Sequence, residues 1–345
     1  MIRRKFRLSA LPTSTYIFVL VFVFFGLTVP KFWSPANLST LLLQSSVMLT
    51  IAMGMALVIM TGGVDLSMGG NISLCAVVAG ALLRAGQHWA IAIVAALLTG
   101  TAIGFLNGIV VQKMKVVPFI ATFGMANIAQ SLANTIAGKR TVYWEPMPQN
   151  QFIDTLSKNL FSYSFGEGKA ADVLSLAYIS LACLVAILVV NVAFQKTRLG
   201  PYVYAIGANQ ETARLSGIQV DRWRIGVFML AGCLSAIAGC MLMIRTQAVQ
   251  PTLGDGLEFY AVVSAVLGGN MMSGGKGSVA GAMLGVLVLY SIRSALTLMG
   301  VSTFWVMVVV GVVLIVGMVI NSMVQLYEKK ALMRTRQTAT GGDRR

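Results

Sequence analysis

Long stretches without a charged residue constrain the fold of this chain more than any other feature. They cover residues 8–30, 32–64, 66–83, 85–112, 116–138, 173–195, 225–244, 259–275, 277–292 and 294–327. Only 11% of all residues are charged, whereas a soluble domain averages about 25%. A membrane-spanning helix needs about 20 mostly apolar residues. The chain is therefore predicted to be an all-α polytopic membrane protein.

The boundaries of these runs predict about ten transmembrane helices. The first run follows a basic N-terminus, as in a signal peptide, but it is too long for one and lacks a cleavage site, so we expect an uncleaved span. The predicted spans are residues 12–30, 40–60, 67–83, 89–111, 118–137, 173–195, 225–246, 257–271, 277–297 and 303–325.

The basic residues set the predicted orientation. With the N-terminus inside, 18 of the 26 lysines and arginines fall in cytoplasmic segments, as the positive-inside rule requires. An even number of spans then places both termini in the cytoplasm. The net charge of +15 is explained by these loops, so no nucleic-acid partner is expected.

The spans divide into two possible five-helix halves within a single transmembrane domain covering residues 1–345. The halves are about 12–137 and 173–325, and an odd number of spans in each is what inverted repeats require. An extracytoplasmic loop, 138–172, joins them, and its aromatic and charged composition predicts partial folding against the membrane. A basic tail follows at 329–345.

The longest polar segment on the predicted cytoplasmic side, residues 195–224, contains a compact helix pattern. Asn209 can cap a helix by accepting a backbone N–H bond. Glu211 and Arg214 suit the helix dipole, and Gly217 can end the helix in a left-handed conformation. A helix of about two turns is predicted, which either transmits force to a partner or belongs to a basic loop that only sets topology.

Glycines interrupt the apolar pattern in two places, residues 61–70 (the first glycine break) and 268–277 (the second glycine break). Each begins with a pair, Gly62–Gly63 and Gly268–Gly269. Backbone groups left unpaired at membrane depth are tolerated where they are buried or line a watery cavity, so both breaks are candidates for a polar pathway or for tight turns. Neither fits the spacing of a phosphate-binding loop, which excludes ATP binding by this chain.

Asp65 is the carboxylate most open to a functional role, because intramembrane acids are functional candidates. The competing and favoured interpretation is structural: Asp65 or Ser67 can satisfy the first free N–H groups of the span that begins at 67. Asp255 and Glu258 can do the same for the span at 257–271.

Neutral amides inside the spans suit a hydroxyl-rich solute, or else they join helices by hydrogen bonds. The candidates are Asn71, Asn127 and Gln130. The four cysteines all lie within apolar runs and are interpreted as small buried hydrophobic residues. His88 is the only histidine, so neither a metal site nor an intramembrane enzyme is expected.

Three segments resemble the permease subunits of bacterial ribose-type sugar ABC importers. Residues 60–69, MTGGVDLSMG, resemble the GG-[IV]-DLS-x-G motif of that family. Residues 200–217, GPYVYAIGANQETARLSG, resemble its main cytoplasmic loop. Residues 265–277, AVLGGNMMSGGKG, resemble its late glycine motif, with Met271 at the usual serine and Met272 at the usual leucine. The resemblance extends from about residue 40 to 325.

The resemblance implies ten helices, cytoplasmic termini and a permease that pairs with a second copy or a paralogue. It makes residues 196–224 a coupling loop whose short helix sits in a groove of the ATPase. The positions carried over for that contact are Gly207, Ala208, Asn209, Glu211, Ala213, Arg214, Leu215 and Gly217.

The function implied is the membrane-spanning subunit of an ATP-driven importer for a monosaccharide or related polyol in the bacterial inner membrane. ATP and Mg²⁺ would bind a separate ATPase subunit, with no cofactor in this chain, and a periplasmic binding protein would deliver the sugar. Membrane lipid is a further expected partner. The alternative is a proton- or sodium-coupled secondary transporter of a small neutral solute, which usually needs membrane-embedded titratable groups.

Overall fold

A computed structural model describes residues 13–165, 172–302, 304–313, 315–317, 319 and 323. The predicted basic tail, the first twelve residues and part of the 138–172 loop lie outside these residues. The helices are α1 (Thr13–Thr28), α2 (Pro35–Met60), α3 (Met68–Arg84), α4 (Trp89–Gln112), α5 (Pro118–Ala137), η2 (Pro148–Asn150), α6 (Gln151–Leu156), α7 (Tyr178–Lys196), α8 (Leu199–Ala208), α9 (Gln210–Leu215), α10 (Val220–Thr246), α11 (Leu257–Leu267) and α12 (Val279–Leu298).

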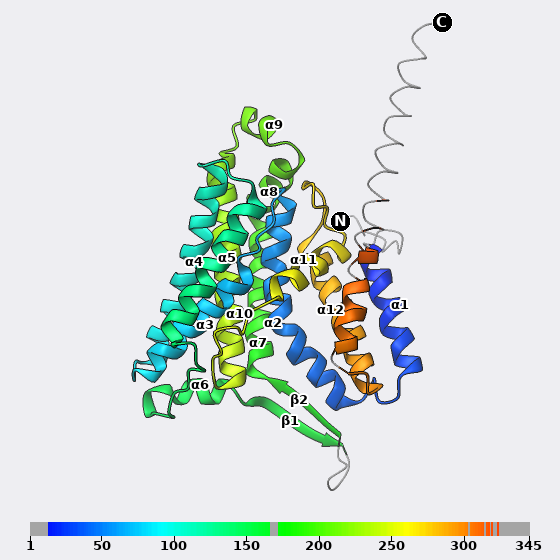
Figure 1. The fold of residues 1–345 in the computed structure, drawn as a ribbon. Coiled ribbons are helices and arrows are strands. Elements are labelled where there is room, and N and C mark those ends of the chain that lie inside the picture. The colour runs from blue at the N-terminus through cyan, green and yellow to red at the C-terminus, as the bar shows by residue number, and fades with distance from the viewer. Residues whose placement is uncertain are drawn as a thin grey trace, which may run out of the picture.

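Five of the described helices, α2, α4, α7, α10 and α12, are long and apolar enough to cross a membrane. Four shorter apolar helices accompany them: α1, α3, α11 and a helix over residues 304–317 that includes positions outside the described ones. These helices and α5 lie within the predicted spans, and the part of the chain that the structure describes is that of an all-α membrane protein with one small hairpin (Figure 1).

The hairpin corrects one predicted span. Residues 173–195 were expected to form one helix, but β2 (Asp172–Ala177) pairs antiparallel with β1 (Asn159–Phe165), and α7 begins only at Tyr178. Because a strand and a helix can both be made from a short apolar run, the absence of charge could not distinguish them. The β-branched Val173 and the neighbouring leucines instead complete a ladder with the aromatic β1.

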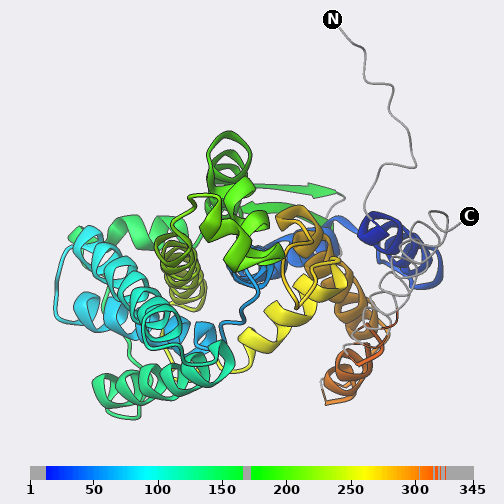
Figure 2. The same ribbon diagram turned by 90° about the horizontal axis from the view of Figure 1, so that it is seen from above.

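Helices α2 and α10 form the centre of the bundle. Most of their apolar residues are buried within the chain itself, whereas the apolar windows of α4 and α7 are largely exposed. Seen along the bundle, α3, α4 and α5 lie on one side of this centre, and α1 and α12 lie on the other (Figure 2). The exposed apolar faces of the outer helices are those expected to meet lipid or another chain.

Small residues bring the helices into close contact. A Cβ at Gly104 of α4 would overlap the Phe228 carbonyl of α10, and one at Gly108 would lie 2.8 Å from the Ile225 Cα. Gly285 of α12 packs in the same way on the Ser264 carbonyl of α11. Close packing through small residues is typical of membrane helices.

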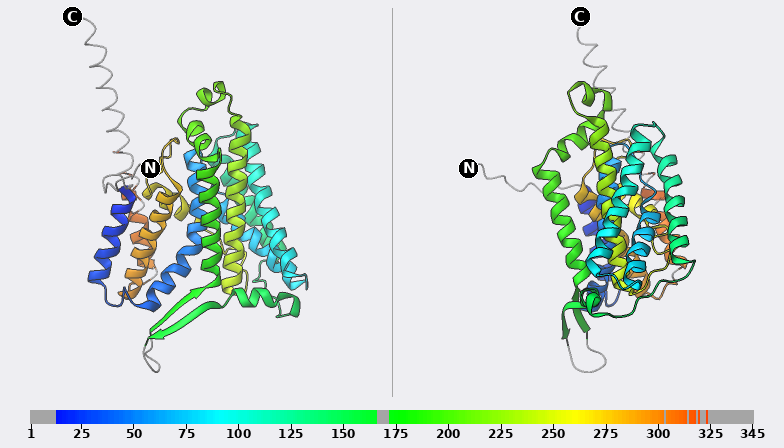
Figure 3. Two further views of the ribbon diagram at one scale, coloured as in Figure 1. Left: turned by 180° about the vertical axis from the view of Figure 1, so that it is seen from behind. Right: turned by 90° about the vertical axis from the view of Figure 1, so that its left-hand side faces the viewer.

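The two long polar segments lie at opposite ends of the bundle. Helices α8 and α9 project from one end, while α6 and the β1–β2 hairpin lie at the other (Figures 1 and 3). The loop 138–172 is partly folded, as its composition predicted, and Val142 pairs with Val249 in an isolated bridge that ties it to the end of α10.

Candidate functional site

Helix α9 has both of the end structures that its sequence predicted. The Asn209 side chain accepts a hydrogen bond from the Thr212 N–H at 2.9 Å, which caps the helix. At the other end Gly217 adopts a φ of +84°. Its N–H bonds the Arg214 carbonyl at 3.0 Å and the Ile218 N–H bonds the Ala213 carbonyl at 3.1 Å, the two bonds of a Schellman motif. The segment is therefore an ordered helical projection.

The outward face of α9 carries the side chains open to a partner. Ala208, Asn209, Glu211, Arg214 and Leu215 are exposed, and Leu215 is 81% exposed. Leu215 is the large apolar side chain among them, so it is available to a protein partner.

Two of the carried-over residues pack against the rest of the chain. Ala213 is 4% exposed and lies with Ile206 and Val220 in a small apolar cluster, so its side chain supports α9 from the inner side. Gly207 is partly buried, and a Cβ there would overlap the Met60 carbonyl and the Gly275 nitrogen. The sequence pattern located the helix correctly but could not say which side of it faces the rest of the chain.

Gly207 marks the point where α8 meets both glycine breaks. The Gly275 N–H donates to the Met60 carbonyl at 2.9 Å, so the second break is hydrogen-bonded to the end of α2. A Cβ at Gly274 would lie 2.8 Å from the Gly62 nitrogen and 2.9 Å from the Gly207 carbonyl. Three segments far apart in the sequence thus meet backbone to backbone, and we call this contact the glycine junction.

Tyr204 adds a side-chain bond to the glycine junction. Its hydroxyl donates to the Gly277 carbonyl at 2.7 Å. Burial raises the pKa of this phenol, which keeps it protonated as a donor. Within the second break, the Asn270 amide donates to the carbonyls of Ala265 and Ser278 at 2.8 and 3.2 Å and so ties the two ends of the loop together.

Arg224 links the same region to α4. Its guanidinium donates to the side-chain oxygens of Gln112 at 2.7 Å and Gln210 at 3.3 Å. A Cβ at Gly63 would lie 3.6 Å from this guanidinium. Gly63 and α9 therefore share one buried cation, which couples the first glycine break to the start of α9.

Asp65 is buried in a cluster of neutral partners. Its Oδ1 accepts from the Ser67 N–H at 2.9 Å, the Ser67 hydroxyl at 2.6 Å and the Asn107 amide at 3.4 Å. The predicted capping of α3 is not found: the Ser67 side chain makes no capping bond, and the only backbone group from which Asp65 accepts is the Ser67 N–H, just before the helix begins. Thr122 of α5 fixes the same segment by accepting from the Leu66 N–H at 3.0 Å.

The neutral amides separate into two groups. Asn71 is buried and donates to the carbonyls of Gly100 and Gly232, so it joins α3 to α4 and α10. Asn127, midway along α5, is exposed, and Gln130 donates to the Pro251 carbonyl at 2.7 Å. Gly268 packs against Gly281 of α12, whereas Gly269 is exposed.

A polar surface that the sequence reasoning did not identify surrounds Asn127. On α5 it continues to Ser131, and it gains Thr252 and Asp255 from the turn that follows Pro251, whose carbonyl accepts from Gln130. Gly70 packs on Ala126 and Gly254 packs on Gly69, which holds the three elements together. The signal for this surface in the sequence is the turn-forming stretch before the short predicted span 257–271. The sequence analysis interpreted Asp255 in that stretch only as a helix cap.

The neighbouring Glu258 lies against the start of α3, where a Cβ at Gly69 would overlap its carboxylate. A negative side chain there suits the positive end of the helix dipole. Neither Asp255 nor Glu258 caps α11 in the described chain, because the residue before that helix is Gly256 and no side-chain capping bond forms.

Comparison with known proteins gives one family. The model of the family described as a branched-chain amino acid transport system permease component matches residues 37–318. The ribose import permease of Escherichia coli strain K12 is 36% identical over 85% of this chain and 88% of its own length. The galactose/methyl galactoside import permease of Haemophilus influenzae is 31% identical, covering 91% and 95%. The L-arabinose ABC transporter permease of Azospirillum brasilense is 30% identical, covering 88% and 85%.

No solved structure matches the chain. The resemblance read from the three motifs is confirmed by these relatives, and membership of an ABC permease family implies a separate ATPase subunit and a periplasmic binding protein as partners. The chain belongs to this permease family, and it is a multi-pass transport subunit of the bacterial inner membrane and not an enzyme.

Proposed function

We propose that this chain is the membrane-spanning subunit of an ATP-driven importer for a monosaccharide or related polyol. The relatives named for ribose, galactose and arabinose support a sugar as the cargo. The observation that carries the mechanism is the glycine junction, because it connects a projecting helical segment directly to two breaks between apolar helices.

In this proposal α9 docks on the ATPase. Its contact face consists of Ala208, Asn209, Glu211, Arg214, Leu215 and Gly217, and Leu215 is the apolar anchor. ATP and Mg²⁺ bind the ATPase subunit, so this chain needs no cofactor. Arg214 pairs with Asp221 at 3.1 Å, which holds the docking helix to α10 while the partner moves.

Movement of α9 then reaches the membrane through α8. Gly207 and Tyr204 connect α8 to Met60 at the end of α2 and to the loop between α11 and α12. At the glycine junction the backbones are in direct contact, with no side chains between them that could rearrange. A displacement of α8 therefore shifts both glycine breaks together. Alternating access follows as a change in the packing of α2, α11 and α12.

The pathway for the sugar is assigned to the polar surface of α5 and residues 251–259. Exposed amide, hydroxyl and carboxylate groups midway along a span are costly against lipid, so this face needs an aqueous route or a second chain beside it. A second permease copy or a paralogue, facing this surface, would enclose the route. Asn127, Gln130 and Gly269 remain pathway residues in this proposal.

The topology proposed is ten spans with both termini in the cytoplasm, which puts α9 on the cytoplasmic side and the β1–β2 hairpin outside. The first and last halves, about 12–137 and 173–325, are proposed to be two five-helix units.

A matched pair of substitutions tests the pathway. Asn127→Leu replaces an exposed amide on the polar surface, whereas Ile128→Leu changes the adjacent exposed residue without changing its polarity. We expect Asn127→Leu to raise the KM for sugar uptake while ATP hydrolysis stays normal, and Ile128→Leu to change neither. Equal KM values in both variants would remove α5 from the pathway.

The function itself is tested by uptake into vesicles that contain the permease, its ATPase and its binding protein. Ribose, galactose and arabinose are offered separately, with ATP or with a proton or sodium gradient. Uptake of at least one sugar that requires ATP and the binding protein is expected. Uptake driven by an ion gradient without ATP would instead establish the secondary transporter.

A further inference from the structure

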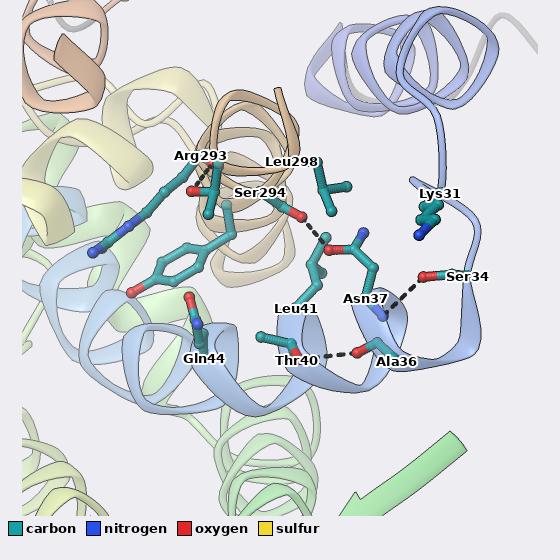
Figure 4. Close-up of a pocket in the computed structure, with 12 residues that line it drawn as sticks. Lys31, Ser34, Ala36, Asn37, Thr40, Leu41, Gln44, Arg293, Ser294 and Leu298 are labelled. Atoms are coloured by element: carbon teal, nitrogen blue, oxygen red, sulfur yellow. Dashed lines mark hydrogen bonds between the residues drawn. The ribbon is translucent and has the colours of Figure 1, made fainter. Parts of the chain in front are cut away.

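A cavity of about 440 Å³ opens at the end of the bundle opposite α9. It lies between the first turns of α2 and the last turns of α12, with Lys31 at its rim (Figure 4). Its walls carry hydroxyls and amides, and the Ser294 hydroxyl donates to Asn37 Oδ1 at 2.6 Å. Neutral groups of this kind hydrogen-bond polyols.

A smaller pocket of about 160 Å³ adjoins the cavity and shares Gln44, Tyr290 and Arg293 with it. Arg245, from the end of α10, enters this pocket as well. Its remaining walls are apolar: Val47, Met48, Leu242 and Leu257. Two guanidinium groups therefore line one small space whose other walls are mostly hydrocarbon.

Neither arginine is balanced by a carboxylate in the described chain. The ion pairs found there join Lys113 to Asp221 and Arg214 to Glu211 and Asp221, all at the α9 end of the molecule. Both guanidinium groups are positively charged and line one pocket, so an anion there would be attracted by both, and a phosphate matches the planar donor fork of arginine.

We propose that the cavity and the adjoining pocket together bind a phosphate ester of a polyol, supplied by the headgroup of an anionic phospholipid. The phosphate lies between Arg245 and Arg293, and the polyol lies among the hydroxyls and amides of the larger cavity. This site is separate from the polar surface assigned to the sugar pathway.

A lipid source is favoured by the surface around the cavity. Helix α1 ends beside its rim and exposes Leu20, Phe24 and Leu27, which offer an apolar path for acyl chains. Trp33, 50% exposed and next to the rim residue Ser34, is the residue type enriched at membrane interfaces. Basic pockets between membrane helices on the cytoplasmic side hold anionic headgroups, and the proposed site offers the same chemistry at the opposite end of the bundle.

The test compares the purified permease with two variants in detergent. Arg245→Gln with Arg293→Gln removes the proposed phosphate ligands, and both side chains are exposed, so the core is unchanged. Lys139→Gln with Arg140→Gln removes the same charge from the exposed loop after α5. The midpoint of thermal unfolding is measured with added phosphatidylglycerol, with phosphatidylcholine and with glycerol 3-phosphate.

Phosphatidylglycerol is expected to raise the midpoint of the wild type and the loop control by several degrees, and that of the arginine variant by less than half as much. Phosphatidylcholine and glycerol 3-phosphate should have little effect. Equal shifts in all three proteins would overturn the site, and a full shift with glycerol 3-phosphate alone would overturn the lipid source. If the double variant aggregates, native mass spectrometry counts the phosphatidylglycerol molecules retained by the single variant Arg293→Gln and by the wild type. Equal retention by the two proteins would contradict the proposal.

Discussion

At the scale of single residues, Asp65 is a buried carboxylate held entirely by neutral groups of Ser67 and Asn107. A coupling carboxylate must exchange a proton or bind a cation, whereas a structural one needs only to accept hydrogen bonds. Asp65 accepts the Ser67 N–H just before α3 begins. Its geometry favours the structural role.

This role predicts different results for two substitutions of Asp65. Asn keeps the acceptor for the Ser67 N–H, and its amide can donate to Asn107 Oδ1, a buried oxygen without a partner in the described chain. Asp65→Asn should therefore transport nearly normally. Asp65→Leu leaves the Ser67 N–H and hydroxyl without an acceptor, which costs about 1–3 kcal/mol of folding free energy for each buried group. This variant should therefore lower permease abundance or transport. Sugar uptake is measured at matched permease levels. Loss of transport by the Asp65→Asn variant at normal abundance would favour an ion-coupling role for Asp65.

The sequence predicted the ends of α9 correctly because each end depends on neighbouring residues. Asn209 bonds an N–H three residues away, and Gly217 needs only its own backbone freedom. The roles of Ala213 and Gly207 depend on contacts with Val220, Met60 and Gly275. A single sequence carries no signal for those distances, so it could not show that these two residues pack against the rest of the chain.

At the scale of elements, the docking helix can be tested by separating its outer face from its support. Leu215→Glu adds a charge to the proposed anchor without touching the core, so ATP hydrolysis stimulated by the binding protein and sugar uptake should both fall while the melting midpoint is unchanged. Gln219→Glu adds the same charge outside α9 and should leave transport normal. Normal transport in Leu215→Glu would remove Leu215 from the docking face.

Ala213→Arg is predicted to act differently from Leu215→Glu. Ala213 is buried with Ile206 and Val220, and a long charged side chain there overpacks the cluster, at about 1–3 kcal/mol or more. The variant should show faster proteolysis of residues 196–224 along with any loss of transport. Proteolysis at the wild-type rate would place Ala213 on the surface.

Helix positions were largely predictable and the exceptions share one cause. Lack of charge over 20 residues specifies an apolar environment, and most such runs became helices at the expected places. In the run 173–195 the first residues, from Val173, form strand β2 and only the remainder is helical. Lack of charge alone does not decide between these outcomes.

At the scale of the whole molecule, orientation is open to direct measurement. Thr155 and Gln219 are exposed at opposite ends of the bundle, and three of the four native cysteines are buried. Cysteine at 155 should react with an impermeant thiol reagent from the periplasm, and cysteine at 219 only after the membrane is opened. The wild type gives the background, and the reverse order of labelling would invert the proposed topology.

The glycine junction is the feature that sequence reasoning could not predict. The sequence marks each of its three segments as unusual. The contact itself, however, joins residues 60, 207 and 275, which lie far apart in the sequence. Such contacts are decided by the packing of all the helices between them. Their meeting at one point connects the docking helix with both breaks, and it is the central claim of the mechanism.

Gly207→Ala tests that claim most directly, with Gly226→Ala as control. A Cβ at 207 overlaps the Met60 carbonyl, whereas a Cβ at 226 has no atom within 4 Å. The measurement is the amount of sugar taken up per ATP hydrolysed, in vesicles containing the permease, ATPase and binding protein. We predict that Gly207→Ala lowers this ratio severalfold while hydrolysis continues, and that Gly226→Ala keeps the wild-type ratio. A wild-type ratio in Gly207→Ala would contradict transmission through the glycine junction.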